Sequence, residues 1–109
     1  MLSSEMSRCV DICLSCYRTC LQTAMDHCLE MGGEHVEPKH FRLMMTCAEI
    51  CRTSAHVMLI GTPHHKHTCA ECAEICSESA NDCERIGGMA ECVTQCRACA
   101  NACREMVAQ

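Results

Sequence analysis

One stretch organises the whole sequence: residues 9–20 read CVDICLSCYRTC. Its cysteines follow one another after four, three and four residues, and residues 92–103 (CVTQCRACANAC) repeat those gaps. On an α-helix, which has about 3.6 residues per turn, such gaps keep side chains on one face. Each stretch therefore predicts a helix with a stripe of thiols where an ordinary helix carries Leu, Ile and Val.

The composition indicates a modest core built from sulfur. The chain has 109 residues, of which 15 are cysteine and nine are methionine, and its aromatic residues are limited to Tyr17 and Phe41. Free cysteine buries like a small hydrophobic residue, so periodic cysteines can take the place of an aliphatic core. The length suits one core, and we expect residues 1–109 to form a single domain.

The charge and the first residues argue against several classes of partner. A formal net charge of −5 without a basic cluster disfavours nucleic acid and anionic membranes. The start, MLSSEMSR, lacks the basic and apolar regions of a signal peptide, and no apolar run approaches the length of about 18 residues expected of a membrane span. We therefore expect a cytoplasmic protein, in whose reducing surroundings dense cysteine indicates metal binding before disulfides.

Capping and helix-breaking signals divide the chain into four helices, expected over residues 4–31, 38–60, 62–86 and 89–107. Ser3 or Ser4 can cap the first, and glycine pairs at 32–33 and 87–88 end the first and third. Pro38 suits the first turn of the second helix, and Thr62-Pro63 opens the third. Four helices with short connections predict an all-α fold, an antiparallel up-down-up-down four-helix bundle with a cysteine-lined core.

An internal repeat relates the second and third helices. Residues 47–58 (CAEICRTSAHVM) align without gaps on residues 72–83 (CAEICSESANDC), and the alignment extends back to place Met44 over Cys69. Met44 and Met58 thus stand where the other helix has cysteine. Two interpretations fit: methionine is a second soft ligand for Cu(I), or it simply fills the core.

Inward-facing thiols at this spacing suit Cu(I). Helix neighbours three or four residues apart have Cβ atoms about 5–6 Å apart, so two thiolates can flank one ion at a metal–sulfur bond of about 2.3 Å. Cu(I) is soft and accepts few ligands, whereas Zn(II) favours a closed tetrahedron. Because a buried thiolate needs a counter-charge, neutrality predicts a capacity on the order of 12–16 Cu(I) ions per chain.

The predicted ligands are cysteines from all four helices, with histidine and methionine at the bundle ends. Cys28 falls on the edge of the stripe, while His35 lies in a loop where a surface histidine is expected. The candidate metal ligands are Cys9, Cys13, Cys16, Cys20, Cys28, Cys47, Cys51, Cys69, Cys72, Cys76, Cys83, Cys92, Cys96, Cys99, Cys103, His27, His40, Met44, Met58, His65 and Met89. No catalytic residue is predicted.

Other functions fit the pattern less well. A disulfide within one helix would need Cβ atoms about 3.5–4.5 Å apart, closer than helix neighbours lie. A copper chaperone needs only one exposed cysteine pair, and a redox enzyme or electron carrier would show coloured clusters or turnover. We interpret the chain as a non-enzymatic Cu(I) storage and detoxification protein, with a metallothionein-like zinc or cadmium buffer as the alternative.

The sequence also resembles a known family. The segments CAEIC (47–51), CAECAEIC (69–76) and CVTQCRACANAC (92–103), with the stripe of residues 9–20, resemble the cytosolic copper storage proteins, a bacterial family of cysteine-lined four-helix bundles. The resemblance implies storage of many Cu(I) ions inside each bundle, tetramers of bundles, and passage of metal through an end that bears His and Met. An aliphatic stripe that includes Val10, Leu14 and Tyr17 independently favours a homo-oligomer.

Overall fold

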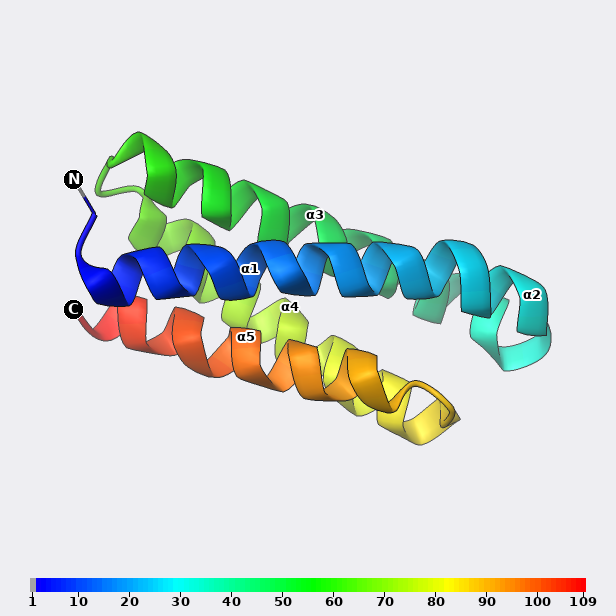
Figure 1. The fold of residues 1–109 in the computed structure, drawn as a ribbon. Coiled ribbons are helices and arrows are strands. Elements are labelled where there is room, and N and C mark those ends of the chain that lie inside the picture. Colours follow the sequence, from blue (N-terminus) through cyan, green and yellow to red (C-terminus); the bar gives the residue numbers. More distant parts are fainter. Residues whose placement is uncertain (1) are drawn as a thin grey trace.

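The computed structural model describes residues 2–109, and these residues form helices and no strand. The prediction of an all-α, antiparallel four-helix bundle is confirmed (Figure 1). The elements are α1 (Ser4–Gln22), the π-helix η1 (Thr23–Cys28), α2 (Leu29–Met31), the 3-10 helix η2 (Gly33–Val36), α3 (Pro38–Ile60), α4 (His65–Ile86) and α5 (Ala90–Ala108).

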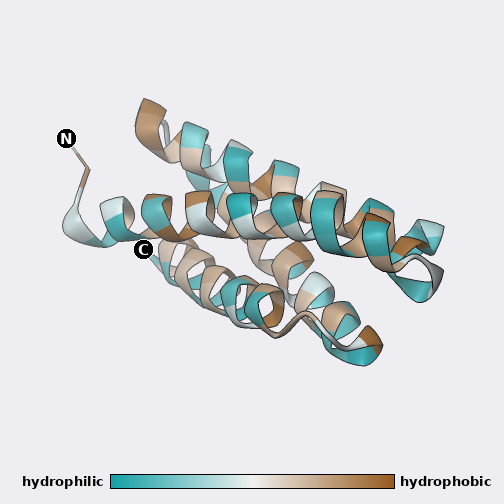
Figure 2. Ribbon diagram, turned by 45° about the vertical axis from the view of Figure 1, so that its right-hand side comes forward, coloured by the Kyte–Doolittle hydropathy of each residue, from teal (hydrophilic) through white to brown (hydrophobic). Residues whose placement is uncertain are grey.

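The four long rods lie side by side in a narrow bundle. The first rod consists of α1, η1 and α2 in succession. Helix α1 packs beside α3 and α5, and α4 packs beside the same two helices. The bundle measures 44 × 19 × 19 Å, and the N- and C-terminal segments meet at the same end. Figure 2 shows hydrophobic and hydrophilic residues alternating around the helices, as expected when one face of each rod turns inward.

Local hydrogen bonds set the helix boundaries. The Ser3 hydroxyl accepts the N–H of Met6 at 3.1 Å, as a capping serine should. The Glu37 carboxylate caps α3 by accepting two backbone N–H groups, and Pro38 occupies its first turn. The prediction that Thr62-Pro63 opens the third helix is wrong by a few residues. The N–H of His65 bonds back to the Thr62 carbonyl at 3.3 Å in a tight turn, and α4 begins only at His65.

The π-helix corrects the expectation for the end of the first rod. In a regular α-helix, eight residues turn about 80° past two full turns, which would carry Cys28 away from the stripe that Cys20 begins. The wider π-type turns, with the Leu29 N–H bonded to the Ala24 carbonyl, absorb the extra residue. Cys28 is therefore fully buried, and His27, which the spacing predicted to face inward, is only half-buried.

The core combines sulfur with small residues. Buried alanines on the inner helix faces let the rods approach closely, and the partly buried aliphatic side chains pack around the margin. By length and composition alone α3 could cross a membrane. In the bundle its Met44, Cys47 and Cys51 side chains are fully buried, so part of this hydropathy comes from core residues. The buried alanines are Ala24, Ala48, Ala55, Ala73, Ala80, Ala100 and Ala102.

Deleting one residue from the π-helix tests this account. We expect removal of Met25, which is exposed, to leave Cys28 seven residues after Cys20, in phase with an ordinary α-helix. Cys28 should stay buried, and the thermal midpoint should stay unchanged or rise.

The matched control is deletion of Met45, an exposed residue of the regular helix α3. This deletion should rotate Cys47 out of phase with Met44 and lower the midpoint by about 5 °C or more. Circular dichroism melting and alkylation of Cys28 measure both effects. Equal losses from the two deletions would contradict the role assigned to η1.

Candidate metal centre

Every cysteine lies inside the bundle. All 15 are free thiols, and the exposed fraction of each is 0 or 1%. The inward orientation predicted from the spacing is confirmed for the stripes of α1, α3, α4 and α5. The interior of this fold is thus a column of sulfur along the bundle axis.

The thiols form one continuous network. Sulfur–sulfur contacts of 3.4–4.0 Å connect all cysteines except Cys28 and Cys69. The closest approach is 3.4 Å between Cys20 on α1 and Cys96 on α5. At the end near the termini the network reaches Cys9, which lies 4.0 Å from Cys103. Since the links are continuous, an ion anywhere in the column has further thiols within reach.

Three groups of four thiols each converge closely enough to hold a metal ion. Within each group the sulfur atoms lie within 4.8 Å of one another. Two cysteines, Cys16 and Cys99, belong to two groups each, so the groups are not independent sites. The groups are Cys13, Cys72, Cys99 and Cys103; Cys16, Cys20, Cys47 and Cys96; and Cys16, Cys51, Cys76 and Cys99.

These groups differ from the same-helix pairs that the spacing suggested. Contacts within one helix occur between Cys16 and Cys20 and between Cys72 and Cys76. The other sulfur contacts of the network join different helices. The physical reason is the narrow bundle, in which short thiol side chains from four inward stripes meet at the axis.

The packed thiols influence one another's ionisation. Hydrogen bonds from the Cys16 and Cys20 thiols lower the pKa of Cys96 to about 5. Hydrogen bonding to Cys16 and Cys47 in turn raises the pKa of Cys20. At the far end, burial raises the pKa of Cys28, and the nearby Cys83 raises it further. A thiolate in this core is therefore stabilised at the expense of its neighbours, so full ionisation requires cations from outside.

The end formed by α2, η2 and the turn before α5 gathers a different set of donors. The Cys28 sulfur lies 3.6 Å from the Met44 sulfur and 3.7 Å from the Met89 sulfur. It also lies 4.0 Å from Nδ1 of His35. The His35 ring meets the His27 ring edge-on at a centroid distance of 5.0 Å, and the buried Nε2 of His27 has no hydrogen-bond partner. Two thioethers, one thiol and two imidazoles thus converge at this end.

The sequence misplaced His35 as a surface residue. Periodicity gave no signal for it, because its position depends on the turn that starts at Gly32, whose φ of +66° favours glycine. This turn folds η2 back over the end of the bundle and leaves His35 half-buried.

The other predicted histidine and methionine ligands fall in different surroundings. His40 is buried, with 1% of its surface exposed. His65 is half-buried, and its Nδ1 is bonded to the Thr62 carbonyl at 3.0 Å. Met58 is fully buried at the end near the termini, but among residues 2–109 neither it nor His65 joins the hydrogen-bonded sulfur network.

Comparison with known proteins assigns the chain to a family. The sequence profile described as "Copper storage protein" matches residues 2–108. The chain belongs to the copper storage protein family. The cysteine-rich protein YhjQ of Bacillus subtilis (strain 168), described as uncharacterized, is 31% identical over 102 residues, which cover 92% of this chain and 94% of that protein.

Three solved structures of similar sequence share the fold. The Nmul_A1745 protein from Nitrosospira multiformis superposes with a TM-score of 0.93 at 55% identity, covering 95% of each chain. Cu(I)-bound copper storage protein BsCsp3 gives a TM-score of 0.87 at 29% identity, covering 95% of this chain and 99% of that one. The apo form of CSP3 from Bacillus subtilis gives 0.76 at 31% identity, covering 93% and 97%.

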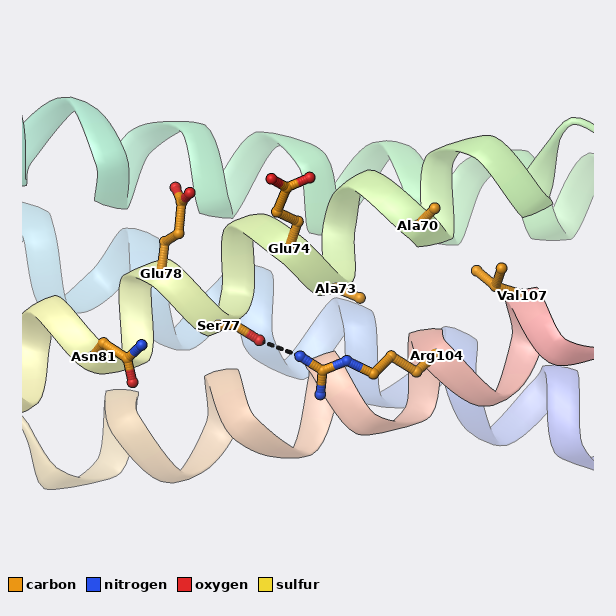
Figure 3. Close-up of a pocket in the computed structure, with 8 residues that line it drawn as sticks. All are labelled: Ala70, Ala73, Glu74, Ser77, Glu78, Asn81, Arg104 and Val107. Carbon is orange, nitrogen blue, oxygen red and sulfur yellow. Dashed lines mark hydrogen bonds between the residues drawn. The ribbon is translucent and has the colours of Figure 1, made fainter.

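The outer surface of this copper storage family member offers a contrasting hollow between α4 and α5 (Figure 3). Small side chains, among them Ala70 and Ala73, line it beside Glu74 and Glu78, and Arg104 donates a hydrogen bond to Ser77 at 2.6 Å. No thiol lines this hollow. This hollow is therefore separate from the buried thiol column.

The position of each thiol along the bundle predicts the order in which the thiols react with an alkylating reagent. Because helix ends open more readily than the middle of a core, we expect Cys9 and Cys28 to be alkylated at least about tenfold faster than Cys16 and Cys99 in the metal-free protein. Pulsed alkylation under reducing, metal-free conditions, followed by peptide mass spectrometry, measures the order. Faster labelling of the two central cysteines would contradict a closed sulfur column.

Proposed function

We propose that this chain stores and detoxifies copper by holding many Cu(I) ions on its inward-facing thiolates. The observation that carries the proposal is the unbroken column of buried sulfur, with contacts of 3.4–4.0 Å and three overlapping groups of four thiols. Membership of the copper storage family and the likeness to a Cu(I)-bound structure support it. The family points to a non-enzymatic role, and the whole chain serves as one copper-binding unit.

Charge balance supports Cu(I) over a divalent ion. One Zn(II) with four thiolates leaves two negative charges in a core that contains no cationic side chain among its buried residues. One Cu(I) for each thiolate leaves no net charge in the core. Shared thiols such as Cys16 and Cys99 also suit bridging by a soft ion. A zinc or cadmium buffer is thus the weaker candidate.

The ligands we propose are the 15 cysteines, assisted by methionine and histidine at the ends. At the end that holds Cys28, copper first meets neutral donors from Met44, Met89 and His35. Neutral thioethers and imidazoles bind Cu(I) without adding negative charge, so they suit a transient stop on the way to the thiolates. His27 and His40 belong to this end; Met58 and His65 are the proposed assisting ligands at the opposite end.

Assembly and location extend the proposal. Exposed apolar side chains, including Leu14, Leu59 and Ile60, remain on the surface of one bundle. We propose that they pack between copies of the chain in a homo-oligomer, a tetramer by its resemblance to the family. Reduced thiols and a soft monovalent ion suit the bacterial cytoplasm.

Anaerobic titration with Cu(I) tests the storage role. We expect saturation on the order of 12–16 equivalents per chain, because each thiolate needs about one positive charge. Metal analysis of the desalted protein and competition with a Cu(I) chelator provide the measurement. Saturation at one or two equivalents, or a preference for Zn(II) over Cu(I) at matched chelator strength, would overturn the proposal.

Single substitutions test the shared groups. We expect Cys16→Ala to reduce the capacity by more than one equivalent, because Cys16 belongs to two groups of four thiols. The matched control is Cys9→Ala, an equally buried cysteine of the same helix that belongs to none of them, and it should cost one equivalent at most. Each variant should lose about 1 kcal/mol of metal-free stability through the small cavity left. Equal losses of capacity would contradict the overlapping arrangement.

Copper binding should also depend on pH. The raised pKa values of Cys20 and Cys28 keep these thiols protonated at neutral pH in the metal-free protein. Copper must displace their protons, roughly one for each thiol engaged. Lower pH therefore favours the protonated, metal-free form, and retention of copper against a chelator should weaken as the pH falls. A pH-independent affinity, measured with a chelator corrected for its own protonation, would contradict this coupling.

A further inference from the structure

One buried histidine lies in an arrangement that the cysteine pattern does not explain. His40 is 1% exposed, and its Nδ1 lies 2.7 Å from Oδ2 of Asp82 on the neighbouring helix α4. Its second ring nitrogen, Nε2, is buried and has no hydrogen-bond partner in the described part of the chain. A buried polar atom without a partner is unusual in a native core.

Asp82 is itself held in place. Its other oxygen, Oδ1, accepts hydrogen bonds from Nε and Nη2 of Arg85 at 3.0 and 2.8 Å. With Oδ1 paired to the Arg85 guanidinium, the carboxylate of Asp82 presents Oδ2 as the acceptor for the ring of His40.

This acceptor determines which nitrogen of the ring carries the proton. A carboxylate can only accept, so the His40 ring must donate from Nδ1, and in the form with one ring proton the lone pair is on Nε2. The backbone of the same residue is fixed too, because Glu37 accepts its N–H at 3.0 Å. His40 lies four residues before Met44 and seven before Cys47 on the inward stripe of α3, and both of those side chains are fully buried.

We propose that Asp82 is a positioning residue that holds His40 in its Nδ1–H form, so that Nε2 serves as a nitrogen ligand for Cu(I) beside the thiol column. The inference rests on the proposed storage function for its metal. A carboxylate bonded to the far nitrogen of a ligating histidine fixes the ring orientation and raises its basicity. It also gives a purpose to the unpaired Nε2, which a purely structural histidine would bond to protein or exchange for an apolar residue.

The internal repeat distinguishes Asp82, the partner of His40, from the matching residue of α3. In the repeat that relates α3 to α4, Asp82 aligns with Val57, so an ionisable side chain stands where the sister helix has an aliphatic one. Asp82 also directly precedes the buried Cys83, and its side chain is 22% exposed, unlike the exposed Glu84 on the other side. It is the carboxylate that reaches the buried ring of His40.

The first measurement uses the metal-free protein. In ¹⁵N-labelled wild-type chain, the long-range ¹H–¹⁵N spectrum of the imidazoles should show His40 with its proton on Nδ1. Asp82→Asn, whose amide can either accept or donate, should lose this preference. Glu84→Gln is the matched control, because Glu84 lies on α4 like Asp82 but pairs with Arg97 of α5 and bonds to no histidine. An unchanged tautomer in Asp82→Asn would overturn the proposal.

The second measurement is a double-mutant cycle on copper retention. Against a Cu(I) chelator, Asp82→Asn should weaken retention of one ion about ten- to a hundredfold, as loss of an outer-shell partner does. His40→Gln should weaken it at least as much, and adding Asp82→Asn to His40→Gln should cause no further loss. Glu84→Gln should match the wild type.

The outcomes separate this inference from the storage proposal. Suppose that the wild type loads fully and that Asp82→Asn weakens copper retention equally in the wild type and in His40→Gln. Asp82 then affects the stability of the whole bundle and not His40, and the inference is overturned. Full loading with unchanged retention in His40→Gln also overturns it and leaves storage intact. Saturation of the wild type at one or two equivalents instead overturns the storage function itself.

Discussion

The structure depends on sulfur that occupies the place of hydrocarbon. Neutral thiols pack as small apolar groups, so four rods can close around them, and alanine, methionine, Val10 and Val93 supply the other buried apolar side chains. The same thiols become costly once they ionise, because a buried charge without a partner is unstable. The buried polar residues of the core are His40, Ser54 and Ser79, and none supplies a permanent cation. This interior is therefore suited to protonated thiols and to thiolates neutralised by a monovalent metal, but not to full ionisation without metal.

The width of the bundle decides how the thiols cooperate. In a cross-section of 19 × 19 Å, a thiol from one helix reaches thiols on the other helices as easily as those on its own. Cys16 on α1 belongs to groups completed by α3, α4 and α5. Such sharing makes one extended lattice of donors rather than a row of separate sites. It also means that the middle of the column has the richest choice of ligands and the ends the poorest.

Much of this arrangement was predictable from the sequence, because one signal, the gap of three or four residues, determines both the helix and its inward face. The four rods, the glycine breaks and the burial of the cysteine stripes follow from it. Three features do not. Cys28 is fully buried and His27 only half-buried, because a π-helix interrupts the period of the α-helix. His35 reaches the end cluster through a glycine turn. The cross-helix groups depend on how far apart the rods lie, which a pattern along one helix does not contain.

The repeat between α3 and α4 shows why the ends differ chemically from the middle. Where α4 has Cys69 and Cys83, α3 has Met44 and Met58, so α3 contributes thiols to the centre and neutral thioethers towards both ends. At the end near α2 this neutrality is reinforced by Met89 and by the imidazoles of His35 and His40. An ion held there by neutral donors keeps its positive charge, whereas an ion held by thiolates is neutralised. If this chain stores Cu(I) as proposed, the gain in charge balance favours transfer of the ion from this end into the thiol column.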